Sequence, residues 1–104
     1  MVTGKYRVVW AKSAQSALDD AIAYIAEDSR EAAGRVLELV LATAEGLSTL
    51  ARRGRVVPEV GDSATREVFA FRYRVLYEVR GDTVEIVAFL HGARDFERWR
   101  RENQ

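Results

Sequence analysis

Residues 65–95 read TREVFAFRYRVLYEVRGDTVEIVAFLHGARD, and the other segments of the chain can be placed around them. Valine, isoleucine, phenylalanine and tyrosine dominate this segment, which is the composition that β-strands favour. Two short junctions, Arg72 with Tyr73 and Gly81 with Asp82, divide it into three runs. We therefore predict a meander of three antiparallel strands.

Alternation assigns the side chains of each run to one of the two faces of the sheet. In the middle run, one face carries Tyr73, Val75, Tyr77 and Val79, and the other carries Arg72, Arg74, Leu76, Glu78 and Arg80. In the last run, the wholly apolar face carries Val84, Ile86, Ala88 and Leu90. In the first run, the residues predicted to point into the core are Phe69 and Phe71, and those predicted to point outward are Arg66, Val68 and Ala70.

One consequence of this alternation concerns the polar residues of the meander. Arg66, Arg74 and His91 are predicted to emerge together on one open face of the sheet. The prediction requires regular pairing, because a bulge would move every residue beyond it to the opposite face.

The segments before the meander supply a strand and two helices. A strand is predicted over residues 5–10, and the spacing of apolar residues predicts helices over residues 14–27 and 30–51. Ser13 and Ser29 stand where the N-caps of these helices are expected. The two helices are predicted to form a hairpin.

The remaining segments are short. A strand is predicted over residues 55–60, and Pro58 restricts it to a sheet edge or a strand end. A final helix is predicted over residues 94–102 and carries Phe96. The apolar stripes of the helical hairpin need a sheet face to cover. The predicted fold class is therefore α+β, with an N-terminal strand, a helical hairpin, an antiparallel meander and a short C-terminal helix in one domain over residues 1–104.

Composition narrows the chemistry. The 104 residues include no cysteine and one histidine, so a disulfide framework and a thiolate metal site are excluded and a dedicated zinc site is disfavoured. We expect no metal and no cofactor. No apolar run approaches the length of about 20 residues that a membrane span needs. With no signal peptide in view, a cytoplasmic protein with no membrane partner is expected.

Charge is balanced overall but uneven along the chain. The 16 basic and 16 acidic residues cancel, which does not favour strong binding to nucleic acid. Residues 52–74, however, contain six arginines against three acidic residues. Arginine is the better planar fork for phosphate, although a GC-rich genome explains an excess of arginine equally well.

Several polar residues of this region together match the needs of RNA cleavage without a metal. The candidate catalytic residues are Glu59, Arg66, Arg74 and His91, and the candidate substrate-binding residues are Arg55, Arg72 and Arg94. A carboxylate can take the proton of the 2′-hydroxyl, and an imidazole can protonate the leaving 5′-oxygen. Guanidinium groups can hold the phosphate and its developing charge. The product would be a 2′,3′-cyclic phosphate, and DNA would not react because it lacks the 2′-hydroxyl.

Simpler explanations exist for each of these residues. A lone histidine such as His91 is more often structural than catalytic. An arginine in the middle of a strand, such as Arg74, needs an anionic partner, and a salt bridge alone would account for it. The candidate partners are Glu59, Glu67 and Glu85. Two aromatic residues of the last helix, Phe96 and Trp99, fit packing better than base stacking.

The order and spacing of several motifs resemble the RelE/ParE superfamily, the toxins of type II toxin–antitoxin modules, over nearly the whole chain. These motifs are YRVVW at 6–10, GR at 54–55, PE at 58–59, RE at 66–67, YRVLY at 73–77 and HGARD at 91–95. RelE-like and YoeB-like members cut mRNA in the ribosomal A site, whereas ParE-like members share the fold and poison DNA gyrase.

The resemblance implies a growth-inhibiting toxin with two candidate targets. YRVLY resembles the ribonuclease branch, in which the arginine at the place of Arg74 is catalytic. Glu59 resembles the glutamate base of the YoeB-like type, and His91 lies near its terminal histidine. Arg66 and Arg94 resemble basic positions of RelE-like enzymes. The first hypothesis is therefore a ribosome-dependent mRNA endonuclease.

The alternatives are a ParE-like gyrase inhibitor without nuclease activity and a degenerate toxin that only binds its antitoxin. The HGARD ending resembles that of many gyrase-directed members. The resemblance also implies a cognate antitoxin that is small, partly disordered and DNA-binding. Its extended segment is expected to occupy the open sheet face and the groove beside the last helix, where it would bury Arg74.

Overall fold

The computed structural model describes residues 5–103, except for the side chains of Ala93 and Arg94. Arg94, predicted to bind substrate, therefore lies outside the described side chains. The elements follow the predicted order: β1 (Arg7–Trp10), α1 (Lys12–Asp28), α2 (Arg30–Glu45), a 3-10 turn η1 (Gly46–Ser48), β2 (Arg55–Val56), β3 (Thr65–Ala70), β4 (Tyr73–Arg80), β5 (Thr83–Leu90) and α3 (Ala93–Glu102). The α+β fold class is confirmed.

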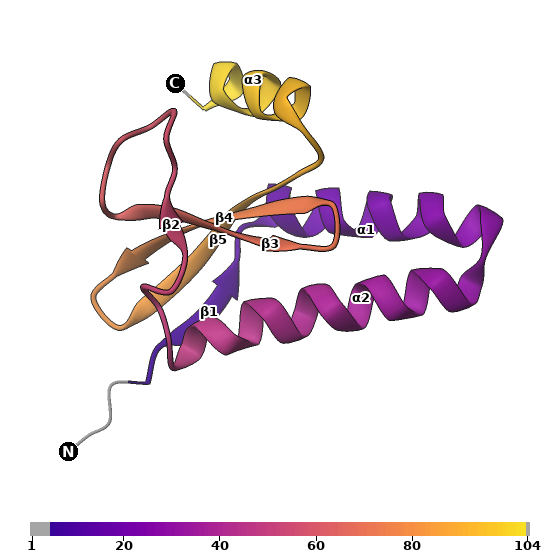
Figure 1. Ribbon diagram of the computed structural model, residues 1–104, viewed down its shortest axis with the longest axis horizontal. Coiled ribbons are helices and arrows are strands. Elements are labelled where there is room, and N and C mark those ends of the chain that lie inside the picture. The colour runs from indigo at the N-terminus through magenta and orange to yellow at the C-terminus, as the bar shows by residue number, and fades with distance from the viewer. Residues whose placement is uncertain (1–4, 104) are drawn as a thin grey trace.

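One five-stranded sheet, in the order β1-β5-β4-β3-β2, forms the middle of the molecule. β3, β4 and β5 form the predicted antiparallel meander, and β1 adds to β5 in parallel. Helices α1 and α2 lie side by side as an antiparallel pair, and α3 lies apart from them (Figure 1). Within the described residues, no helix combines the length and the apolar character needed to cross a bilayer.

The start of α1 and the end of α2 differ from their predicted positions. Helix α1 begins at Lys12 with Ala11 at the N-cap and no side-chain cap, so the prediction for Ser13 is wrong. Ser29 does cap α2, because its hydroxyl accepts the N–H of Ala32 at 3.1 Å. Helix α2 ends before residue 51 because the chain tightens into η1.

Apolar side chains cover both faces of the sheet. The larger cluster lies between the sheet and the helical hairpin, and its fully buried members include Leu18, Val40, Leu47, Val75, Tyr77, Val84 and Ile86. A smaller cluster lies beneath α3 and contains Val57, Leu76, Ala88, Leu90 and Phe96. The second face is therefore covered by α3 and by the segment after β2, not open as predicted. We call the two faces the hairpin face and the α3 face.

A bulge in β5 divides its apolar residues between these faces. Leu76 lies opposite Ala88, but the next residue of β4, Tyr77, lies opposite Ile86, which leaves Val87 as an extra residue. The prediction that the four apolar residues of this strand share one face is therefore wrong. Val84 and Ile86 face the helical hairpin, and Ala88 and Leu90 face α3.

The orientation of β3 also differs from the prediction. Ala70 lies opposite Tyr73, so the turn consists of Phe71 and Arg72, one residue earlier than the predicted junction. A two-residue turn places Phe69 opposite Arg74, away from the hairpin face. Val68 and Ala70 are the buried residues, whereas Phe69 and Phe71 are each 56% exposed. The predicted inward and outward sets of β3 are thus reversed.

Candidate functional site

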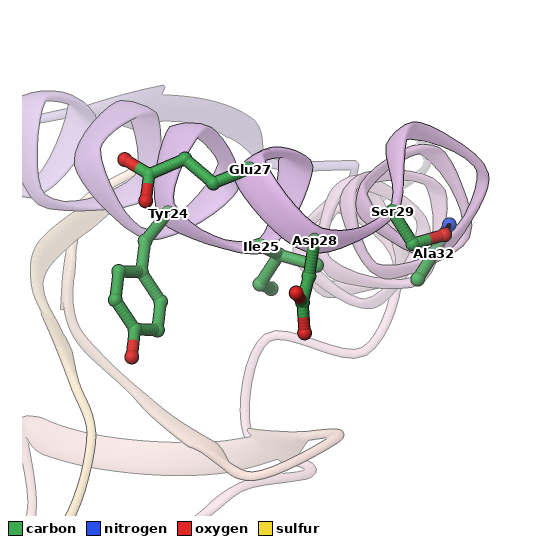
Figure 2. Close-up of a pocket in the computed structure, with 6 residues that line it drawn as sticks. All are labelled: Tyr24, Ile25, Glu27, Asp28, Ser29 and Ala32. Atoms are coloured by element: carbon green, nitrogen blue, oxygen red, sulfur yellow. Dashed lines mark hydrogen bonds between the residues drawn. The ribbon is translucent and has the colours of Figure 1, made fainter.

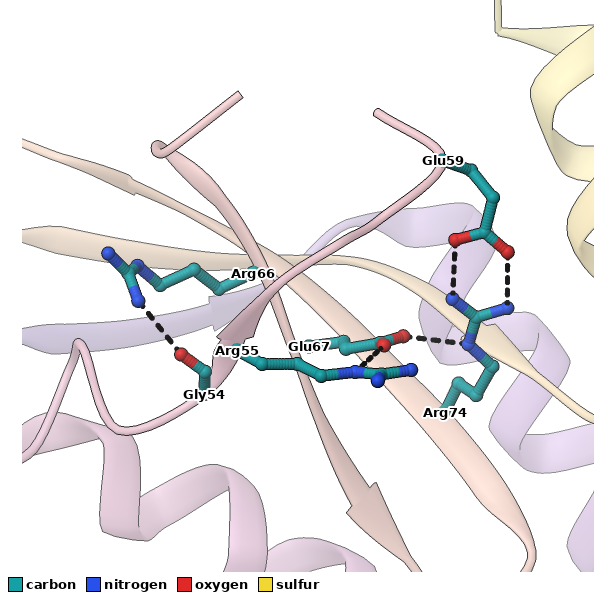
Figure 3. Close-up of polar contacts among 6 residues, drawn as sticks. All are labelled: Gly54, Arg55, Glu59, Arg66, Glu67 and Arg74. Atoms are coloured by element: carbon teal, nitrogen blue, oxygen red, sulfur yellow. Dashed lines mark hydrogen bonds and ion pairs between the residues drawn. The ribbon is translucent and has the colours of Figure 1, made fainter. Parts of the chain in front are cut away.

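Arg74 lies on the α3 face at the centre of an ion-pair network (Figure 3). Its Nε donates to Oε1 of Glu67 at 2.7 Å, and its two terminal nitrogens donate to the two oxygens of Glu59 at 3.1 and 3.3 Å. The guanidinium carbon also lies 5.0 Å from the ring centroid of Phe96. The predicted anionic partner of Arg74 therefore exists, as Glu59 and Glu67 together.

Glu67 is the buried member of this network. Its side chain has no exposed surface, and its second oxygen accepts the Nε–H of Arg55 at 2.5 Å. An ionised carboxylate is stable in such a place only when it is paired and hydrogen-bonded. Sequence reasoning identified Glu67 only as one of three possible partners of Arg74. The third candidate, Glu85, instead lies opposite Glu78.

The ion pair between Glu59 and Arg74 shifts the pKa of both groups. The hydrogen bonds that Arg74 donates lower the pKa of Glu59 and outweigh the opposing effect of burial. Burial by itself would lower the pKa of Arg74, but the hydrogen bonds to Glu59 and Glu67 outweigh it, so the net change raises that pKa. Glu59 and Arg74 are therefore both charged at neutral pH, and the guanidinium of Arg74 is already paired with carboxylates within the chain.

Arg66 lies on the other side of the sheet. It pairs with Tyr77, and its guanidinium donates to backbone oxygens of Gly54 at 2.9 Å and of Ser63 at 3.1 Å. It thereby holds the segment before β2, which passes close to the sheet at Gly54. The N–H of Gly54 donates to the hydroxyl of Tyr77 at 3.0 Å, and burial raises the pKa of that hydroxyl.

His91 also lies on the hairpin face, because the bulge reverses the alternation of β5. Its ring lies 5.1 Å from that of Tyr73, which stacks in turn on Phe89. Its backbone N–H donates to Asp95 at 2.9 Å. The prediction that Arg66, Arg74 and His91 share one face is therefore wrong. Within the predicted catalytic set, the structure brings only Glu59 and Arg74 into contact.

Two of the concave regions on the described part of the surface lie away from this network. One is a groove between α1 and α3, with β5 at its floor, and its residues include Ala14, Ala17, Tyr73, Phe89, His91, Asp95, Arg98 and Trp99. The other is a hollow at the end of the helical hairpin, around Tyr24 and Asp28 (Figure 2). There the ring of Tyr24 and the carboxylate of Asp28 project to one side, and that of Glu27 points away. The groove agrees with the predicted hollow beside the last helix.

Comparison with known proteins identifies the family. Residues 8–96 match the sequence profile described as the ParE toxin of the type II toxin–antitoxin system, parDE. No curated protein sequence matches the chain. One similar solved structure is described as a chromosomal ParDE toxin–antitoxin system from P. aeruginosa; it matches with a TM-score of 0.71 and 16% identity over 88% of this chain and 100% of that chain, which shows a shared fold. The resemblance to the RelE/ParE superfamily is thus confirmed, and the chain belongs to the ParE toxin family of type II toxin–antitoxin systems.

Proposed function

We propose that this toxin arrests growth by binding DNA gyrase and that it does not cut RNA. The observation that carries the proposal is the separation of Arg74 from His91. Cleavage of RNA requires a base, an acid and a phosphate-binding cation around one phosphate. Here the imidazole lies on the hairpin face and Arg74 lies on the α3 face, with the sheet between them.

The burial and the ion pairs of Arg74 also argue against a role in RNA cleavage. Its side chain is only 11% exposed, and two carboxylates occupy its donors. A phosphate would have to displace Glu59 and then lie near the buried charge of Glu67. Removing a partner from a buried ion pair is costly, so this arginine is better suited to holding the fold together than to holding a substrate.

The overall charge of the chain also supports gyrase binding over binding to the ribosome. Ribosomal RNA attracts strongly basic proteins, whereas this chain has no net charge. Binding to a protein target does not need such an excess. The ribosome-dependent endonuclease stays a prediction, and no contact among the described residues favours it over gyrase binding.

Family membership also implies a cognate antitoxin as partner. We propose that the antitoxin binds in the groove between α1 and α3. Alanines of α1 and the rings of Tyr73 and Phe89 provide apolar contacts there, and Asp95 and Arg98 stand at the side that α3 forms. Such a groove suits an amphipathic segment that folds as it binds.

The test compares the two activities directly. Purified toxin should inhibit supercoiling of a plasmid by gyrase, and addition of the antitoxin should restore it. In parallel, primer extension on messages from cells that express the toxin should show no new ends within codons. New cuts in mRNA together with unimpaired supercoiling would reverse the assignment.

A further inference from the structure

Two exposed phenylalanines lie at the turn between β3 and β4, whose labels mark the two strands in Figure 1. Phe69 and Phe71 are each 56% exposed. A guanidinium lies over each ring, with the carbon of Arg55 at 5.5 Å from the centroid of Phe69 and that of Arg72 at 5.4 Å from Phe71. We call these four residues the Arg–Phe tip.

The backbone of the tip is strained at Phe71. Its φ of 57° makes it the one non-glycine residue with positive φ among those described. A bulky side chain in this region is a true outlier and costs on the order of 1–3 kcal/mol, whereas glycine would adopt the conformation freely. More than half of the surface of Phe71 remains in solvent, so burial within the chain offsets little of this cost.

The tip also has cationic groups available to a partner. Among the described side chains, Arg72 forms no ion pair, and Arg55 uses only its Nε in the pair with Glu67. Arg55 remains 59% exposed. Exposed aromatic residues beside arginines are the residue types that dominate the centres of protein–protein interfaces. The complementary surface would be acidic and would have apolar atoms to cover the rings.

We propose that the Arg–Phe tip is the surface through which the toxin contacts an acidic patch on its target enzyme; this inference rests on the proposed gyrase function. A protein partner is favoured over single-stranded nucleic acid for two reasons. One side of each ring is already occupied by a guanidinium, which leaves less room for a stacked base. The chain as a whole also lacks the positive charge that nucleic-acid binding needs.

Two variants of the tip test this inference against two matched controls. Phe71→Gly removes the ring and relieves the positive-φ strain, and its control Leu41→Ser removes a side chain that is 46% exposed on α2. Arg72→Glu reverses one exposed charge of the tip, and its control Arg35→Glu makes the same change in net charge on α2. The measurements are inhibition of gyrase supercoiling, thermal unfolding and co-purification with the antitoxin.

We expect each tip variant to need about tenfold more toxin than wild type for the same inhibition, which corresponds to a loss of about 1.4 kcal/mol in binding. Phe71→Gly should unfold at the same temperature as wild type or higher, so the loss would not reflect misfolding. Both controls should inhibit like wild type. A tip variant that inhibits as well as its control overturns the inference, although the gyrase proposal survives.

Two other outcomes also overturn it. If wild-type toxin fails to inhibit gyrase, the proposed function falls and this inference falls with it. If wild type binds a labelled single-stranded oligonucleotide without gyrase, and Phe71→Gly and Arg72→Glu lose that binding, the tip is a nucleic-acid surface and not a protein-docking surface.

Discussion

The Nε–H of Arg74 points at the fully buried carboxylate of Glu67 across 2.7 Å. The same carboxylate accepts a hydrogen bond from Arg55, so one buried anion holds β2 and β4 to β3. Glu59 then joins the segment after β2 to the same guanidinium. Two of the residues predicted to be catalytic, Glu59 and Arg74, thus belong to a structural network that connects three strands with the segment over the α3 face.

Replacing Glu67 should be strongly destabilising. Glu67→Gln removes the buried anion that pairs with both Arg55 and Arg74, and it leaves the largely buried Arg74 with Glu59 alone. We expect a loss of about 3 kcal/mol in the free energy of unfolding. Denaturation by urea measures this loss. Glu78→Gln, which removes the surface pair with Arg80, is the control and should cost less than about 1 kcal/mol. Equal effects of the two substitutions would contradict the structural role of Glu67.

The contribution of Glu59 should disappear in acid. Because the folded pKa of Glu59 is lowered by Arg74, its pairing stabilises the protein above the ordinary pKa of glutamate, about 4.3, and this stability is lost as pH falls through the lowered value. Wild type should therefore unfold at a higher temperature than Glu59→Gln near neutral pH. The difference should close as the solution is acidified below that range, as thermal unfolding across a pH series would show.

Two glycines should respond to alanine in opposite directions. A Cβ at Gly54 would lie 2.5 Å from the backbone oxygen of Glu67 and 2.6 Å from the hydroxyl of Tyr77, so Gly54→Ala should destabilise the fold by about 2 kcal/mol or more. Gly34 lies in α2 with no atom near its added Cβ, so Gly34→Ala should stabilise by about 0.5–1 kcal/mol. A tolerated Gly54→Ala would show that the close approach of this segment to the sheet is not required.

The two serines predicted as N-caps should differ in how much they stabilise the fold. Ser29→Ala removes the hydroxyl that caps α2 and should cost about 1 kcal/mol. Ser13→Ala removes a side chain that makes no cap hydrogen bond, and its effect should lie within about 0.5 kcal/mol of zero. Thermal unfolding of both variants measures the difference, and a larger loss from Ser13→Ala would contradict the helix start observed at Lys12.

The sequence by itself determined the order of the helices and strands, and it showed which individual residues need an ion-pair or hydrogen-bond partner. Apolar spacing predicted the helical hairpin and the meander because each element must bury one face, and that requirement is local. The same reasoning showed that Arg74 needs an anionic partner and that Ser29 can cap a helix. The order and spacing of the family motifs along the chain then predicted a toxin of a type II toxin–antitoxin system.

Only the tertiary structure decided which faces meet. The bulge at Val87 lies inside an apolar run, so no change of residue type marks the position where Ala88 passes to the α3 face. Phe69 and Phe71 have core composition, yet a two-residue turn leaves them in solvent. Strand register depends on packing against both helical layers at once, and a shift of one residue moves every later side chain to the opposite face. That shift separates His91 from Arg74, and it is the physical reason that the predicted catalytic set is not assembled.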